Sequence, residues 1–265
     1  PSITDGSGKA AGSPANAVKV SFRDANLRYA GAGADSLSDI TFDVAPGETV
    51  GIIGGTGSGK SSLVNMIPRF YDASQGSVCI DGVDVKDYTL DELRHKVGVV
   101  PQKAVLFAGT IADNIRWGKQ DATEAEIDEA LEIAQAKEFV DGKENGIYFK
   151  ITQGGKNLSG GQKQRLTIAR AVVRKPEILI LDDSASALDF ATDAALRKAI
   201  REKTKGMTVF LVSQRASTIM NSDKIIVMDD GQIAGIGTHR QLLSNCEIYR
   251  EICQSQLSEE ELSHE

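Results

Sequence analysis

Short apolar runs alternate with helical patterns along most of the chain. The segments VKVSFRDANLRY, which starts at Val18, and ITFDV carry β-branched and aromatic residues in partial alternation, as half-buried strands do. Five further short runs are typical of buried strands: TVGIIG, SVCIDG, VGVVPQ, ILILD and TVFLVS. KIIVMDDGQIAGIG predicts a hairpin that turns at Asp230-Gly231. Strands that alternate with helices predict an α/β layer fold.

Helical patterns occupy the segments between several of these strands. Thr123 and Glu126 have the spacing of a capping box, and apolar residues then recur at helical intervals. Residues 158–175 and 192–205 also have helical patterns, and the chain from Thr238 onward is predicted to be helical.

Composition changes along the chain and indicates its organisation. Residues 1–17 are small and polar, which predicts a flexible linker. Residues from about 89 to 165 have few strand signals, so we expect a mainly helical subdomain there. The chain ends in the acidic run SEEELSHE, predicted to be frayed.

Charge and cysteine content narrow the class of protein. The 265 residues carry a net charge of −7, which argues against general nucleic-acid binding. Three cysteines without metal-ligand spacing indicate reduced thiols in a cytosolic compartment. Since no apolar run approaches the ~18 residues of a membrane helix, this stretch of polypeptide is predicted to fold in water.

A glycine-rich motif follows one of the predicted strands. GGTGSGKSS matches G-x-x-x-x-G-K-[ST] and precedes a helical pattern, which is the context that a phosphate-binding loop requires. Its backbone N–H groups can turn toward phosphate, Lys60 can reach the β- and γ-phosphates, and Ser61 can ligate Mg²⁺. The alternative is an ordinary glycine-rich turn. The candidate nucleotide-binding residues are Gly54, Gly55, Thr56, Gly57, Ser58, Gly59, Lys60, Ser61 and Ser62.

Two further motifs contain chemistry that a nucleotide site needs. ILILDDSASALD ends a buried strand at Asp182, which can hold Mg²⁺ opposite Ser61. LSGGQKQR opens a helix with Ser159 and two glycines, so it forms a second potential anion site. Alone, it could equally be an N-capped helix after a glycine loop. Two phosphate sites far apart in one chain suggest a nucleotide held between two subunits.

Together these motifs resemble the nucleotide-binding domain of ABC transporters, specifically of the exporter type. The resemblance covers residues 18–255 and leaves 256–265 as an acidic tail. It identifies GGTGSGKSS as Walker A, LSGGQ as the signature and ILILD as Walker B. VVPQ with Gln102 looks like the Q-loop, and SALD with Asp189 looks like the D-loop. FAGTIADNI, residues 107–115, looks like the exporter segment that faces the coupling helices of a transmembrane domain.

The resemblance implies a P-loop NTPase fold with a RecA-like core, an antiparallel β subdomain and a helical signature subdomain. It implies ATP and Mg²⁺ as ligands. Tyr29 stands 25 residues before Gly54, where the family places an aromatic residue that stacks on adenine; taken alone, Tyr29 would be expected in a strand core. Other implied nucleotide contacts are Ser159, Gly160, Gly161, Gln162 and Asp189, and the implied Mg²⁺ ligands are Ser61, Gln102 and Asp182.

The resemblance also implies partners. Two cassettes pair head to tail, so that each ATP lies between Walker A of one chain and the signature of the other. Residues 1–17 then look like a connector from a transmembrane domain, and the chain is expected at the cytoplasmic face of the cell membrane. Coupling helices of its own and the partner's transmembrane domains would contact it.

Three positions depart from the family pattern. Asp183 replaces the usual catalytic Glu and is one methylene (~1.5 Å) shorter, although general-base work needs a reach of about 2.6–3.2 Å. Gln214 replaces the usual switch His, and TQGGKN, residues 152–157, lacks the expected Glu. Neutral drift or engineered substitution could explain them. We favour one chain of a heterodimeric exporter whose own site, with Asp183, Gln214 and Gln102, hydrolyses ATP slowly.

Three alternatives stay open. The chain could belong to a homodimeric exporter that uses Asp183 as its base. It could be a regulatory module that binds nucleotide without turnover. An ABC ATPase acting on nucleic acid is disfavoured, because the chain has neither a coiled-coil insertion nor a second cassette.

Overall fold

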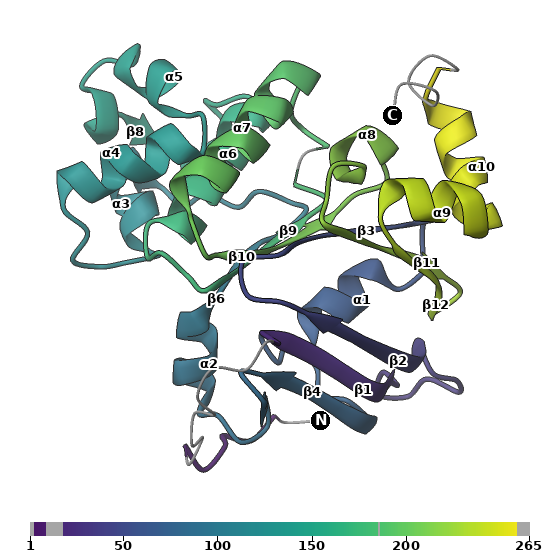
Figure 1. Cartoon of the computed structure of the whole chain (residues 1–265). Coiled ribbons are helices and arrows are strands. Elements are labelled where there is room, and N and C mark those ends of the chain that lie inside the picture. Colours follow the sequence, from purple (N-terminus) through teal and green to yellow (C-terminus); the bar gives the residue numbers. More distant parts are fainter. Residues whose placement is uncertain (1–2, 9–17, 185, 259–265) are drawn as a thin grey trace. The chain divides into compact units, whose positions relative to one another are not determined.

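The computed structural model describes residues 3–8, 18–184 and 186–258 (Figure 1). Most of the predicted linker (1–2 and 9–17) and the end of the predicted tail (259–265) lie outside them. The described residues up to Val97, together with those from Thr208 onward, form one compact unit. The described residues from Gly98 to Met207 form a second unit.

An antiparallel sheet in the first unit has the strand order β2-β1-β4-β5. Burial alternates along most of β2, since successive side chains point to opposite faces, whereas register shifts interrupt the alternation in β1. Phe22 and Phe42 are cross-strand partners with stacked rings 4.6 Å apart. The strands are β1 (Val20–Leu27), β2 (Leu37–Val44), β4 (Gln75–Ile80) and β5 (Val83–Asp84).

Four more strands lie in the described part of the first unit, and the phosphate loop follows one of them, β3. Strand β3 (Thr49–Gly54) is parallel to both β10 (Thr208–Val212) and β11 (Lys224–Asp229). Buried on both faces, β3 and β10 read as continuous apolar runs rather than alternating ones. The predicted hairpin is confirmed, because β11 pairs antiparallel with β12 (Gln232–Gly237).

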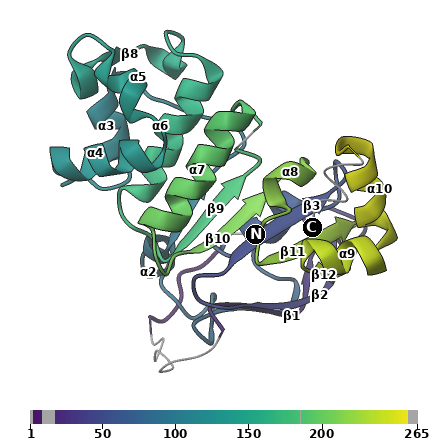
Figure 2. The ribbon, with the colours of Figure 1, turned by 45° about the horizontal axis from the view of Figure 1, so that its top comes forward.

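Five helices complete the described part of the first unit. α1 (Lys60–Asn65) follows the phosphate loop directly, and α8 (Ala216–Ile219) follows β10. The predicted helical C-terminal region is confirmed as α9 (His239–Asn245) and α10 (Glu247–Gln256), with α9 beside β12 in both views (Figure 1, Figure 2).

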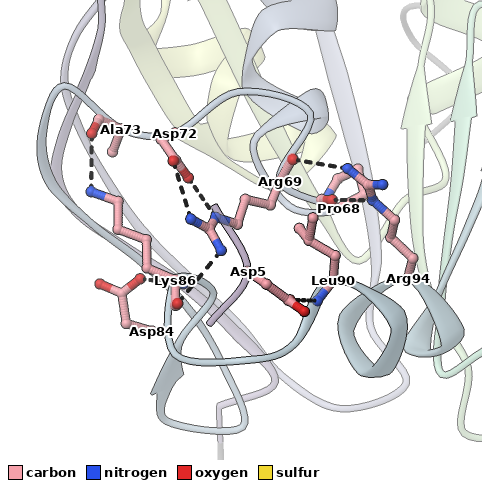
Figure 3. Close-up of polar contacts among 9 residues, drawn as sticks. All are labelled: Asp5, Pro68, Arg69, Asp72, Ala73, Asp84, Lys86, Leu90 and Arg94. Carbon is pink, nitrogen blue, oxygen red and sulfur yellow. Dashed lines mark hydrogen bonds and ion pairs between the residues drawn. The ribbon is translucent and has the colours of Figure 1, made fainter. Parts of the chain in front are cut away.

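The fifth helix of this unit, α2 (Leu90–Lys96), contacts the N-terminal segment. Thr89 and Glu92 cap α2 through a capping box. Leu90 N also donates to the Asp5 carboxylate at 2.7 Å (Figure 3). A carboxylate at this end of α2 satisfies a first-turn N–H that has no partner within the helix.

The second unit is mainly helical. Its helices are α3 (Ile111–Arg116), α4 (Glu124–Ile133), α5 (Lys137–Asp141), α6 (Gly160–Val172) and α7 (Phe190–Lys203), with short 3₁₀ turns at Gly146–Tyr148 and Gln153–Gly155. Strands β9 (Ile178–Asp182) and β6 (Val97–Val100) are neighbours in one sheet, and β7 (Gly109–Thr110) pairs with β8 (Lys150–Ile151). No helix in the described part of the chain is long and apolar enough to cross a bilayer.

Local sequence signals identify these helices, but the ends differ: the helix predicted at 158–175 is α6, Gly160–Val172. The capping box of Thr123 and Glu126 is present at the start of α4. The helix expected at 192–205 begins two residues earlier, because the Asp189 carboxylate caps it by accepting from Thr192 N. The second unit extends to Met207, beyond the helical region predicted at about 89–165, because α4 packs against both α6 and α7.

Candidate nucleotide-binding site

The glycines of the phosphate loop are required by close backbone packing. Gly54 ends β3 with φ 158°, and a Cβ there would stand 2.2 Å from the Met228 carbonyl oxygen. Gly59 has φ 97°, and a Cβ there would stand 2.6 Å from Leu37 Cδ2. Only glycine combines these positive φ angles with such approaches at no steric cost. The chain therefore turns tightly between β3 and α1.

Lys60 lies inside this loop. Its side chain is buried, and its ammonium donates to the carbonyl oxygens of Gly54 at 2.8 Å and Gly55 at 2.7 Å. Positions 55 and 57 face open space, with no atom within 4 Å of an added Cβ. A cation enclosed by a glycine loop with open space beside it fits the triphosphate of a nucleotide. Ser61, in the first turn of α1, is exposed.

Tyr29 lies beside the phosphate loop rather than in a strand core. It follows the end of β1 and is partly exposed, so the strand-core alternative is wrong. Its hydroxyl forms a hydrogen bond with Ser62 Oγ at 2.7 Å. Its ring contacts Tyr71 edge to face, with centroids 4.9 Å apart. Tyr71 had no motif around it to single it out in the sequence.

Gln214 occupies the turn after β10. The residue is exposed, and its carbonyl oxygen accepts from Gln256 Nε2 at 2.8 Å. Gln256 Oε1 in turn accepts from Ala216 N at 2.8 Å. Gln256, expected at the start of the acidic tail, is the last residue of α10. Its side chain bonds to the backbone of both Gln214 and Ala216 and so stabilises this turn.

The two adjacent aspartates have different surroundings. Asp182 ends β9 and is buried. Asp183 is partly exposed and adopts φ 46°, a left-handed conformation that Asp and Asn tolerate better than most residues. Its Oδ2 accepts from Gln102 Nε2 at 2.9 Å. The fold thus brings together Gln102 and Asp183, which are 81 positions apart.

The signature motif forms the capped start of α6. Ser159 Oγ accepts from Gln162 N at 3.2 Å, and Gln162 Oε1 accepts from Ser159 N at 3.1 Å. The N-capped helix anticipated as the simpler interpretation is therefore present. It leaves the Ser159 hydroxyl hydrogen able to donate, and Gly160 and Gly161 are first-turn residues whose N–H groups no intrahelical carbonyl can reach. Capping and anion binding are therefore compatible.

Asp189 is the N-cap of α7. Its carboxylate accepts from Thr192 N at 2.9 Å and from Thr192 Oγ1 at 2.8 Å. These bonds, the backbone one first, lower the pKa of Asp189 below its usual value. The carboxylate is exposed and ionised at neutral pH, so it can also accept a bond from another molecule.

A buried network ties residues 105–116 to α6. Asn114 is 1% exposed and exchanges hydrogen bonds with the backbone of Phe107 at 2.9 Å. Arg170 donates to Asn114 O, to Asn114 Oδ1 and to Val105 O, each at 2.9 Å. The exposed rings of Phe107 and Trp117 stack 4.7 Å apart on this segment. The sequence motif pointed to the segment but not to the arginine that holds it.

The candidate residues are divided between the two compact units. The first contains the phosphate loop, Tyr29 and Gln214, and the second contains Gln102, Asp182, Asp183, Asp189 and the signature. Among the described residues, no three His, Cys, Asp or Glu side chains form a metal cluster.

Comparison with known proteins places the chain in a family. A family model described as ABC transporter matches residues 37–186. The chain is 46% identical to an uncharacterized ABC transporter ATP-binding protein of Mycobacterium tuberculosis, over 88% of this chain and 40% of that protein. It is 45% identical to a probable multidrug resistance ABC transporter ATP-binding/permease protein of Bacillus subtilis, over 87% and 39%. The chain spans about two fifths of the length of these relatives.

A solved structure agrees with this family. A bacterial Atm1-family ABC exporter with ATP bound superposes with a TM-score of 0.90 and 36% identity, over 97% of this chain and 45% of that one. The predicted P-loop NTPase fold is therefore confirmed. The chain belongs to the ABC transporter family and has the fold of its ATPase domain.

Proposed function

We propose that the chain is the ATP-binding and hydrolysing cassette of an ABC exporter. The observation that carries this proposal is the Lys60 ammonium, which the carbonyl oxygens of Gly54 and Gly55 hold within the glycine loop. Tyr29 is bonded to Ser62 in the helix that follows this loop. Lys60 binds the β- and γ-phosphates, and Tyr29 stacks on adenine. The exporter named in the structural comparison has ATP bound, which supports the same ligand here.

Mg²⁺ would be held by Ser61, Gln102 and Asp182. When bound, the ion neutralises charge on the phosphates and orients them. Asp182 supplies the carboxylate, and Ser61 and Gln102 supply neutral oxygens, which suits a hard cation. The side chain of Gln102 also donates to Asp183, so the same residue links metal ligation to the base.

The signature of this chain acts on the ATP of a partner cassette. The Ser159 hydroxyl and the N–H groups of Gly160 and Gly161 can donate to phosphate, as described above. We therefore assign head-to-tail pairing with a second cassette, with Asp189 at that interface. Residues 1–17 are the connector to a transmembrane domain, residues 107–115 face coupling helices, and the chain lies at the cytoplasmic face of the cell membrane.

The chain's own site hydrolyses ATP slowly, as the degenerate site of a heterodimer. Asp183 is short and already bonded to Gln102, and Gln214 is an exposed neutral amide in place of an imidazole. The alternatives keep the same site. In a homodimer, Asp183 would serve as the base at full rate, and in a regulatory module there would be no turnover.

Nucleotide binding is tested by titrating the chain with MgATP in a calorimeter. Lys60→Ala should abolish measurable binding, whereas Lys175→Ala, which removes an exposed ion pair with Glu129, should bind as the wild type does. Ser159→Arg should also bind normally here, yet stop turnover at the partner's site in the assembled transporter. Unchanged affinity in the Lys60 variant would contradict the proposal.

The slow site is tested by single-turnover hydrolysis in the assembled transporter, with the partner's Walker B Glu replaced by Gln. Asp183→Glu with Gln214→His should raise the rate at this site, since general-base catalysis contributes about 10²–10⁴-fold. Asp183→Glu alone should give a smaller gain, because the groups act as a unit. If the unaltered site already matches the competent site, the chain is an ordinary cassette with Asp183 as base.

A further inference from the structure

Tyr29 is held at two points, and one of them is an aromatic side chain outside the family motifs described above. Its hydroxyl bonds to Ser62 Oγ at 2.7 Å. Its ring meets Tyr71 at an interplanar angle of 85°, with centroids 4.9 Å apart. An edge-to-face pair of this kind is favoured by the charge distribution of the two rings. In either possible arrangement, Tyr71 leaves at least one face of Tyr29 uncovered.

The loop that presents Tyr71 is clamped by a buried arginine. Arg69 is 4% exposed, and its guanidinium donates to both Asp72 carboxylate oxygens, at 2.6 and 3.2 Å (Figure 3). Arg69 has φ 55°, an uncommon conformation for a long side chain. The pair between Arg69 and Asp72 spans Tyr71 in the sequence and therefore fixes the direction in which the loop turns.

Two basic side chains from the segment after the loop, Arg94 and Lys86, bond to its first and last residues. Arg94 reaches the carbonyl oxygens of Pro68 at 3.5 Å and Arg69 at 3.4 Å, and Lys86 donates to Ala73 O at 3.1 Å (Figure 3). Tyr71 is nevertheless 40% exposed. These hydrogen bonds therefore fix the loop, and with it the position of Tyr71, although Tyr71 is not part of the buried core.

We propose that Tyr71 is a positioning residue for base recognition, which keeps the Tyr29 ring in the orientation that stacks on adenine. The proposal rests on the proposed function, because it assumes that Tyr29 contacts the base. Tyr71 acts through Tyr29 and has no part in binding phosphate. It therefore determines how strongly the base, rather than the triphosphate, adds to affinity.

The expected loss of MgATP affinity follows from the additional χ1 rotamers that Tyr29 would adopt. Without Tyr71, only the hydroxyl bond to Ser62 restrains the ring, which can then populate up to about three staggered χ1 wells instead of one. Apparent affinity falls in proportion to the population of the competent state. The loss of the ring pair should thus weaken MgATP binding about threefold, and no more than about tenfold, the effect of a whole aromatic pair.

The test compares MgATP with magnesium tripolyphosphate, which has no base, by calorimetric titration of the chain. Tyr71→Leu should weaken MgATP about threefold and leave tripolyphosphate unchanged. Tyr71→Phe should bind both as the wild type does, because the contact needs the ring and not the hydroxyl. Phe70→Leu is the matched control, since Phe70 is an exposed aromatic on the same loop that lies against Arg94.

A double-variant cycle separates positioning from a structural effect. In a Tyr29→Ala background, Tyr71→Leu should cause no further loss of MgATP affinity. Equal weakening of both ligands, or a loss that persists in that background, would show that Tyr71 only supports the loop and would overturn the inference. The inference would also be overturned if Tyr71→Leu left the ratio of the MgATP and tripolyphosphate affinities unchanged. If the unaltered chain binds neither ligand, the proposed function itself has failed.

Discussion

Replacing Asp183 by Glu should make the domain less stable even though it lengthens the catalytic side chain. Asp183 has φ 46°, and Asp is several-fold enriched over most residues in this region. A three- to fivefold preference corresponds to about 0.7–1 kcal/mol. Glu also moves the carboxylate about 1.5 Å along the side chain, which breaks or distorts the 2.9 Å bond from Gln102.

The two effects add to a measurable loss. A partly exposed hydrogen bond contributes about 0.5–1 kcal/mol, so the unfolding free energy should fall by about 1–2 kcal/mol in all. The melting temperature should drop by about 2–8 °C for a domain of this size. Urea unfolding of the wild type and Asp183→Glu, followed by circular dichroism, measures the difference directly, provided that the dependence on urea has the same slope for both proteins.

Asp183→Asn is the matched control. Asn adopts left-handed backbone at least as readily as Asp, and its amide oxygen can still accept from Gln102. This variant should lie within about 0.5 kcal/mol of the wild type while losing any function of the carboxylate. If Asp183→Glu proves as stable as Asp183→Asn, the backbone argument is refuted. If the proposed function holds, Asp183→Glu loses stability and gains hydrolysis at the same position.

Three further predictions concern binding, packing and pH. Lys60→Ala should weaken MgATP by roughly a hundredfold or more in calorimetry, since each hydrogen bond to a charged group contributes about 1.5–3 kcal/mol; a change below tenfold would contradict its role. Arg170→Lys should lower the urea unfolding free energy by about 2–3 kcal/mol, because Lys cannot replace all three bonds that the guanidinium donates to Asn114 and Val105; no loss would show that the network is dispensable. The bond from Lys119, followed by the Thr123 backbone bond, lowers the pKa of Glu126 from 4.5 to about 2. The stability gained from this lowered pKa is therefore present above about pH 4.5 and lost as pH falls toward 2, and the wild type and Glu126→Gln should converge in stability over that range.

Contacts between residues close in sequence were the easiest to predict. The capping box from Thr123 to Glu126 spans only four residues, and the turn at Asp230-Gly231 needs two, so both follow from local chemistry. The start of α7 was placed late because Asp189 was assigned to nucleotide contact alone, although a carboxylate three residues before Thr192 is also a helix cap.

Contacts between distant residues could not be predicted without the fold. Tyr71 follows Tyr29 by 42 positions, and nothing in either local sequence indicates that the rings meet. The bond between Gln102 and Asp183 likewise depends on how the second unit folds. Motifs identified which residues carry chemistry, whereas the residues that position them became visible only in the structure.

Arg170 connects helix α6 to the segment that precedes and includes α3. Its three hydrogen bonds join the helix to Asn114 and Val105, on the segment whose neighbouring rings, Phe107 and Trp117, stack on each other. Ser159 lies eleven residues away at the other end, roughly 16 Å along the axis at 1.5 Å per residue. The exposed rings and the signature are therefore connected through one helix and the three hydrogen bonds of Arg170.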